Sequence, residues 1–173
     1  MENLTFREFN KSDANDIIKW ITCEREFYFW SADRYGHYPI NPEEITENYS
    51  RCEKQTYFKP MIMEAAGKPV GHLILRTPTA DKRVIRLGFI IVDGDMRGKG
   101  YGKKLVKFGL DYAKNLLNAT EINLGVFENN TEAIACYKTM GFDFEEDENS
   151  DEIHTFAYKN EVWNYKTMKY KGI

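Results

Sequence analysis

The sequence predicts a mixed α/β domain with a central, largely antiparallel sheet of about six or seven strands and helices on both faces. Three consecutive strand-like runs, 56–65, 70–77 and 84–93, are separated by short turns, which is typical of antiparallel hairpins. A helical stretch then alternates with a strand-like run at 121–127, which indicates a mixed sheet covered by helices. The 173 residues, 42% of them apolar, suit one domain over residues 1–173.

The first third predicts one strand and short helices. LTFREF (4–9) alternates apolar and polar residues, as a half-buried strand does. Ser12 is placed to cap a helix through DANDIIKWI. Residues 27–42 are dense in aromatics and end in prolines, so we expect a helix end and a loop there. NPEEITENYSRC (41–52) offers an asparagine cap, a proline at the first helical position and a second short helix.

Turns and helices account for the rest. Hairpin turns are expected at Gly67-Lys68-Pro69 and at ADKR. From residue 98 to 118 an apolar stripe predicts a long helix. Asn130 or Thr131 caps a helix over TEAIACYKTM, which Gly141 closes. FDFEE is strand-like, and a last strand is expected near VWNYKTMKYK.

Composition excludes several classes of function. The net charge is −3 and the pI about 5.7, with no basic arm or face, so we expect neither a nucleic-acid partner nor a membrane partner. The three cysteines are far apart and fit neither a disulfide framework nor a zinc site, and we expect no metal. MENLTFREFN lacks the apolar core of a signal peptide, so a cytoplasmic location is expected.

The segment VDGDMRGKGYGKKL (92–105) places three glycines where a helix should begin. Glycine there costs about 1 kcal/mol relative to alanine, so close access to the backbone must be needed. A P-loop is disfavoured because Gly100 follows Lys99 where a serine or threonine belongs. A dinucleotide-binding turn is disfavoured because the spacing is G-x-G-x-G rather than G-x-G-x-x-G.

Free N–H groups at a helix start, together with the helix dipole, bind anions such as a pyrophosphate. Arg97, Lys99, Lys103 and Lys104 would add positive charge. A glycine-rich cap with a solvated basic face explains the glycines alone equally well.

Two motifs resemble the GNAT N-acetyltransferase superfamily. R-x-x-G-x-G follows a strand that ends in Val-Asp, as in that family's acetyl-CoA motif. GVFENNTEAIACYKTMGF (125–142) resembles its strand followed by N-x-x-A-x-x-x-Y-x-x-x-G-F. Together they cover about residues 84–142. The resemblance implies a GNAT fold and transfer of an acetyl group from acetyl-CoA (coenzyme A) directly to a primary amine of a small molecule or peptide.

The resemblance also implies roles for particular residues. The backbone of the strand before the glycines would bind the pantetheine arm as an added strand does, with a bulge turning one N–H toward the thioester oxygen. Tyr137 would be the general acid for the leaving thiolate, against the alternative of a core tyrosine. The implied cofactor-binding residues are Ile90, Ile91, Val92, Arg97, Gly98, Lys99, Gly100, Tyr101, Gly102 and Asn130.

The sequence departs from the family at the general base. Arg86 occupies the region where many members have a glutamate, and Gly125 stands where some ribosomal-protein acetyltransferases place one. Candidates that remain open are Glu64, Glu24, Glu26, His72 or a chain of waters. Cys136, beside Tyr137, is disfavoured as a nucleophile because direct transfer needs no covalent intermediate.

The acceptor is expected near the first two helices and the C-terminal strands. Aromatic residues in 27–38 could hold an amine by cation–π contacts, although packing between helices is favoured. The acidic run EEDENSDE (145–152) could attract a cationic amine, although a solvated loop is favoured. A non-catalytic acyl-CoA sensor is the alternative, and GNAT proteins are often dimers, so a homodimer is possible.

Overall fold

A computed structural model describes residues 3–145 and 154–173 of the chain. Within those residues it contains five α-helices and one eight-stranded sheet. The elements in chain order are β1 (Leu4–Glu8), the 3-10 helix η1 (Lys11–Asp13), α1 (Ala14–Trp20), α2 (Glu24–Ser31), α3 (Pro42–Gln55), β2 (Phe58–Ala65), β3 (Lys68–Arg76), β4 (Val84–Val92), the 3-10 helix η2 (Gly94–Met96), α4 (Tyr101–Asn115), β5 (Glu121–Phe127), α5 (Thr131–Thr139), β6 (Phe142–Phe144), β7 (His154–Tyr158) and β8 (Glu161–Tyr170).

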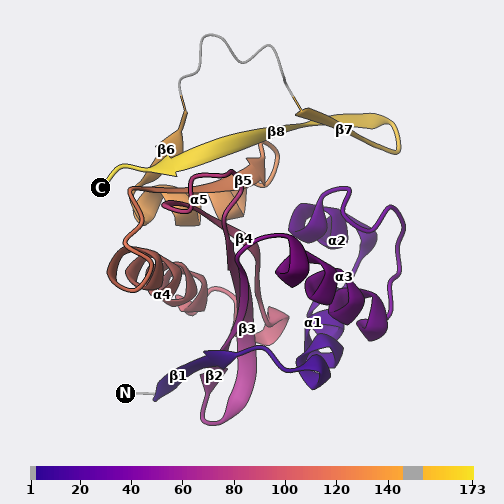
Figure 1. Cartoon of the computed structure of the whole chain (residues 1–173). Helices are drawn as coiled ribbons and strands as arrows, with labels where there is room; N and C mark the ends of the chain where they lie inside the picture. The colour runs from indigo at the N-terminus through magenta and orange to yellow at the C-terminus, as the bar shows by residue number, and fades with distance from the viewer. Residues whose placement is uncertain (1–2, 146–153) are drawn as a thin grey trace.

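The strands lie in the order β1-β2-β3-β4-β5-β8-β6, and β7 pairs with β8 outside this path (Figure 1). All pairings are antiparallel except β4 with β5, which is parallel. The mixed, largely antiparallel sheet is therefore confirmed. It has one strand more than the largest expected number, because β7 forms a hairpin with β8 that the sequence analysis did not include. The expected acidic run lies outside the described residues, apart from Glu145.

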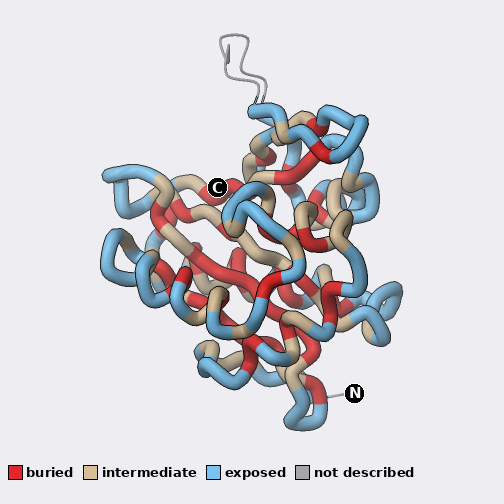
Figure 2. The backbone as a smooth tube through the Cα atoms, turned by 90° about the vertical axis from the view of Figure 1, so that its right-hand side faces the viewer, coloured by how far each residue is buried: buried red, intermediate tan, exposed pale blue. Residues whose placement is uncertain are grey.

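Helices cover both faces of the sheet (Figure 1). Helices α1 to α3 pack on one face around a core that includes Ile17, Phe27 and Ile45. Helices α4 and α5 pack on the other face around a core that includes Leu105 and Tyr137. Buried residues run through the middle of the molecule, and exposed residues lie mainly on its outer bends (Figure 2). The sheet therefore presents a separate interior surface to each helical layer.

Local signals explain the start of α3 and the end of α5. Asn41 accepts a hydrogen bond from the Glu44 amide at 3.0 Å, and Pro42 occupies the first turn, so α3 begins as expected. Gly141 has φ of +91°, which suits the residue after a helix end. Helix α2 extends further toward the N-terminus than the helix end expected from residue 27. No helix in the described part of the chain is both long enough and apolar enough to cross a membrane.

Candidate functional site

The parallel strands β4 and β5 separate halfway along their length. They are paired from Val84 with Glu121 to Leu87 with Leu124, and β4 then continues without this partner. Two parallel strands that part in this way leave the edge of β4 exposed, with backbone groups that can bind an extended ligand.

A β-bulge lies at the point of separation. On β3, His72 pairs with Ile91 and Ile74 pairs with Gly88, so two residues of β4 stand opposite one of β3. The bulge residue Phe89 has φ of +47°, which is uncommon for a residue with a side chain. The indole N–H of Trp30 donates to the Phe89 carbonyl at 3.0 Å. Helix α2 thus holds the bulge that the sequence analysis expected.

A cavity of about 420 Å³ opens beside the freed edge of β4. We call it the β4–α5 cleft, because its walls come from β4, the end of β5 and the start of α5. The predicted site residues that line it are Ile90, Ile91, Val92, Arg97, Asn130 and Tyr137. Six of the eleven predicted residues therefore meet in one cleft, and the glycine segment follows directly after Arg97.

The start of α4 lies open. Gly98 and Gly100 have φ of +73° and +83°, and no atom lies within 4 Å of a Cβ built on either residue. No side chain caps the helix, whose first bond runs from the Lys104 amide to the Gly100 carbonyl. Within the described residues, the amides of Gly98, Lys99, Gly100 and Gly102 donate to no backbone carbonyl. This backbone is therefore available to an anion.

The Arg97 side chain is already held by the protein. Its guanidinium contacts Glu26 Oε1 at 2.6 Å, the Val92 carbonyl at 3.2 Å and the Trp20 carbonyl at 3.3 Å. Arg97 thereby ties the glycine segment to α1 and α2. Desolvation alone would raise the pKa of Glu26. Hydrogen bonds from Thr22 and Arg97 outweigh it and hold this pKa below its ordinary value.

Helix α5 brings Asn130 and Tyr137 to the cleft. Asn130 caps α5 by accepting a bond from the Ala133 amide at 3.4 Å. Tyr137 is 8% exposed and lines the cleft. Burial raises the pKa of Tyr137, with smaller contributions from Cys136 and Tyr165, so the phenol stays protonated at neutral pH. Cys136 does not line the cleft, and burial raises the pKa of its thiol.

A second cavity of about 360 Å³ joins the first. We call it the sheet-face cavity, because it lies over the β3, β4, β5 and β8 side chains that face α2. The two cavities share Phe29, Trp30, Leu87, Gly88, Phe89 and Gly125, so they are continuous at the bulge. Of the aromatic residues expected near the acceptor, Phe29 and Trp30 line the cavities, whereas Phe27 is fully buried in the core.

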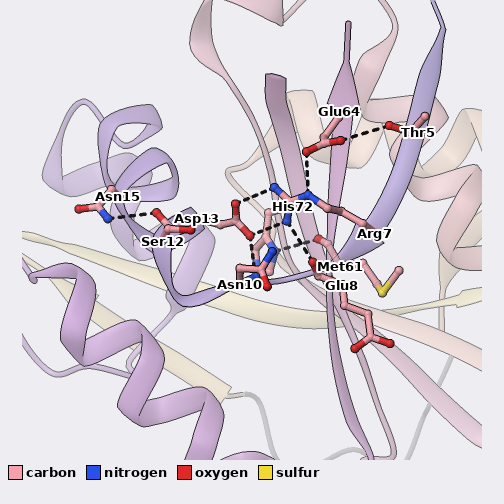
Figure 3. A network of polar contacts seen from close by, with 10 residues as sticks. All are labelled: Thr5, Arg7, Glu8, Asn10, Ser12, Asp13, Asn15, Met61, Glu64 and His72. Carbon is pink, nitrogen blue, oxygen red and sulfur yellow. Dashed lines mark hydrogen bonds and ion pairs between the residues drawn. The ribbon is translucent and has the colours of Figure 1, made fainter. Parts of the chain in front are cut away.

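The four candidate bases are placed differently. Glu64 pairs with Arg7 at 2.7 Å in a network at the β1–β2 edge, which also contains His72 and Asp13 (Figure 3). His72 is fully buried and contacts the Tyr49 hydroxyl at 2.7 Å and the Met61 carbonyl at 3.0 Å. Neither Glu64 nor His72 lines either cavity.

The two glutamates of α2 are also engaged. Glu24 lies outside both cavities, accepting from the Tyr158 hydroxyl at 3.3 Å and pairing with Lys159 at 3.1 Å. Glu26 alone of the four candidates lines the β4–α5 cleft, where it is paired with Arg97. The titratable side chains at the sheet-face cavity that can accept a proton are Asp33 and His154.

Sequence reasoning missed two features of the sheet-face cavity. Arg76 lines it next to Arg86, although only Arg86 had been singled out. A Cβ at Gly125 would lie 1.8 Å from the Tyr165 hydroxyl, so the absent side chain is what allows Tyr165 to lie over β5. The pairing of β5 with β8 brings Gly125 and Tyr165 together, and no local pattern in the sequence predicts this pairing.

Comparison with known proteins adds three findings. A model of the Acetyltransferase (GNAT) family matches residues 15–142. A spermine/spermidine N(1)-acetyltransferase of Bacillus subtilis (strain 168) is 32% identical over 93 residues, which are 51% of this chain and 61% of that protein. An uncharacterized N-acetyltransferase of Methanocaldococcus jannaschii is 27% identical over 154 residues, which are 84% of this chain and 63% of that protein.

The chain thus spans about three fifths of the length of these curated relatives. Among solved structures, the crystal structure of spermidine N-acetyltransferase from Vibrio cholerae in complex with CoA and spermine has a TM-score of 0.76 and 22% identity. The match covers 96% of this chain and 94% of that one, so the two share a fold over almost their whole length.

Proposed function

The chain belongs to the GNAT acetyltransferase family, and we propose that it transfers the acetyl group of acetyl-CoA directly to a primary amine of a small molecule or peptide. The observation that carries the proposal is the separation of β4 from β5 at a bulge, with a cleft beside it. A cofactor with a long amide-bearing arm needs an exposed strand edge of this kind. Acetyl-CoA, when bound, supplies an acetyl group already activated as a thioester.

The proposed cofactor contacts are mostly backbone groups. Ile90, Ile91 and Val92 would bind the pantetheine arm through the freed edge of β4, while their side chains pack. The open amides from residue 98 to 102 would bind the pyrophosphate. The bare space beside Gly98 and Gly100 supports this fit, because side chains there would fill the approach. Arg97 would act mainly by holding this segment in place, since its donors already contact Glu26 and two carbonyls.

Tyr137 is the proposed general acid. Its place in the wall of the β4–α5 cleft and its raised pKa both support a phenol that keeps its proton until a thiolate leaves. A backbone N–H at the Phe89 bulge is the proposed donor to the thioester oxygen, an effect often worth about 3 kcal/mol. Asp33 and His154 are the side chains from which a base would be drawn, directly or through water.

Isothermal titration with acetyl-CoA tests the cofactor assignment, and two capping asparagines provide a matched pair. Asn41 caps α3 away from both cavities, and Asn130 caps α5 in the wall of the cleft. Either change to alanine removes a cap worth about 1 kcal/mol. We expect only Asn130→Ala to weaken acetyl-CoA binding, and absence of binding at millimolar cofactor would refute the assignment.

Thiol release with a panel of amines then separates an enzyme from a sensor. The names of the Bacillus and Vibrio relatives make spermine and spermidine obvious members of the panel. Cofactor binding without release of CoA for any amine would favour the non-catalytic sensor. Association of the chain as a homodimer remains a proposal, to be measured by light scattering.

A further inference from the structure

Two arginines face each other on the floor of the sheet-face cavity. Arg76 of β3 and Arg86 of β4 are direct partners in the antiparallel register, so their side chains leave the same face of the sheet. Directly opposite residues have Cβ atoms roughly 5 Å apart. Both side chains are half-buried and line the cavity, and Arg34 lines it from the end of α2.

Among the described residues, no carboxylate forms an ion pair with Arg76 or Arg86. Elsewhere in the described residues, Arg7, Arg25, Arg83 and Arg97 each have a carboxylate within 4.0 Å. The Arg76 side chain has no hydrogen bond or ion pair with any described residue, and the Arg86 side chain hydrogen-bonds only to the neutral Asn123 and Thr167. The cavity wall holds three arginines and one carboxylate; Asp33 and Arg34 are both exposed, so the half-buried charges are those of Arg76 and Arg86.

Such an arrangement costs stability unless something compensates it. Like charges directly opposite on a sheet repel, and a partly buried charge loses hydration. Burial, followed by the repulsion of Arg86 and Arg34, lowers the pKa of Arg76, but a guanidinium stays charged at any physiological pH. Two charged arginines that line a cavity without a carboxylate partner are expected where a ligand supplies the negative charge.

Arg86 is also held in a fixed direction. Its Nε donates to Asn123 Oδ1 at 2.6 Å, and one terminal nitrogen contacts Thr167 Oγ1 at 3.4 Å. Asn123 is oriented in turn by its amide, which donates to Glu121 Oε1 at 3.0 Å. A planar guanidinium that is oriented before binding suits a carboxylate or a phosphate, because each can accept two parallel hydrogen bonds.

We infer that the acceptor amine carries an anionic group, a carboxylate or a phosphate, which Arg76 and Arg86 bind in the sheet-face cavity. The inference rests on the proposed acetyl transfer and specifies its substrate class. The cavity meets the β4–α5 cleft at Gly88, Phe89 and Gly125, so an acceptor held by the arginines can extend its amine toward the bulge. A polyamine, with several positive charges, is disfavoured by the same arginines.

Matched pairs of amines test this class. The pairs are L-phenylalanine with phenethylamine and glucosamine 6-phosphate with glucosamine, which separate a carboxylate from a phosphate, and spermidine is the polycation. Thiol release gives kcat/KM for each amine. Calorimetry with the protein saturated with CoA measures binding without turnover. We expect kcat/KM for at least one anionic amine to exceed that of its neutral partner by about tenfold or more. A tenfold ratio corresponds to roughly 1.4 kcal/mol.

Three variants assign the effect. Arg76→Met should lower the anionic preference about tenfold without lowering Tm, because the Arg76 side chain forms no hydrogen bond or ion pair with a described residue and methionine keeps the backbone pairing of β3. Arg86→Lys keeps the positive charge but removes the oriented guanidinium. It should lower the anionic preference less than Arg76→Met does. Arg83→Met is the control, since Arg83 is an exposed turn residue paired with Asp81, and it should change nothing.

The outcomes separate the two proposals. Acetyl transfer that is fastest with spermidine or the neutral amines, or a preference unchanged in Arg76→Met, overturns the anionic acceptor and leaves the acetyltransferase standing. If no amine releases CoA, the calorimetry still decides: binding of an anionic amine that Arg76→Met abolishes supports the anion site while the proposed transfer fails. No binding of any anionic amine overturns the inference.

Discussion

His72 should make the fold sensitive to mild acid. It is fully buried, with its Nδ1 near the Met61 carbonyl and its Nε2 near the Tyr49 hydroxyl. The carbonyl can only accept, so Nδ1 carries a hydrogen, and in the neutral ring that burial favours, Nε2 accepts from the hydroxyl. Burial lowers the pKa of His72 from 6.5 to about 4, opposed by the Met61 hydrogen bond and the charge of Asp13.

The direction in which stability changes with pH follows from the difference between the folded and unfolded pKa values. Because the folded-state pKa lies below the unfolded one, the unfolded chain binds the proton more tightly between the two values, and acid favours unfolding. Stability is therefore full above about pH 6.5 and is lost as the pH falls toward 4. With those two pKa values the loss is about 2 kcal/mol at pH 5 and about 3 kcal/mol at pH 4.

The carboxylates with shifted pKa values titrate in a lower window. Asp13, Glu26, Glu121, Glu128 and Glu161 all have folded-state pKa values below their ordinary 3.8 or 4.5. Their contributions are present above those ordinary values and are lost only as the pH falls below them. The change in stability between pH 7 and pH 5 therefore isolates the histidine.

Urea unfolding at pH 7, 6 and 5, followed by circular dichroism, measures the effect. We expect the free energy of unfolding of the natural chain to fall by about 2 kcal/mol over this range. His72→Gln should be less stable at pH 7 but should lose most of the dependence on pH, because glutamine has no proton to gain. A natural chain with constant stability from pH 7 to 5, or a variant with an unchanged slope, would refute a buried neutral His72.

Three further changes test the site. Tyr137→Phe should leave acetyl-CoA affinity within about threefold and lower kcat by roughly a hundredfold, and unchanged turnover would remove the acid role. Gly125→Ala should destabilise the fold by about 1–3 kcal/mol, because its Cβ would overlap the Tyr165 hydroxyl. Urea unfolding measures this, and adding Tyr165→Leu should restore much of the loss; no loss in the single variant would contradict the geometry. Trp30→Phe removes the hydrogen bond to the Phe89 carbonyl at the bulge. We expect it to cost about 1 kcal/mol and to lower kcat more than it raises KM, and kinetics identical to those of the natural chain would show that the bulge does not need this bond.

The sequence predicted the fold well where a signal is local. Asn41 and Pro42 mark the start of α3, and the glycines mark the start of α4, because capping and positive φ depend on a few neighbouring residues. Strand β7 was missed because HTFAY is short, and the turn at Lys159 and Asn160 that joins it to β8 lacks the glycine that often marks a two-residue hairpin. Helix α2 was recognised only at its end, since its apolar face mixes core residues with residues that line the cavities.

The site residues show the same difference between local and tertiary signals. Tyr137, Asn130 and the β4 backbone could be predicted because motifs fix their spacing along the chain. The partnership of Arg76 with Arg86 could not, because it depends on the register of the β3–β4 hairpin, which the seven residues between the two strands do not specify. The exclusion of His72 and Glu64 from the cavities likewise needs the assembled sheet, which places His72 on β3 beside the site and Glu64 one strand further away on β2.

The arginines also bear on the missing carboxylate base. A nearby positive charge lowers the pKa of an ammonium, so the arginines would increase the neutral fraction of an amine bound close to them. An amine whose own anionic group occupies both guanidiniums would lose much of that effect, but Arg34 remains as a third positive charge at the cavity. A glutamate at residue 86 would accept the proton but would repel the anionic group of the same acceptor. Arg86 in the region where many family members carry a glutamate is therefore consistent with a pocket that selects the charge of its acceptor and leaves proton removal to Asp33, His154 or water.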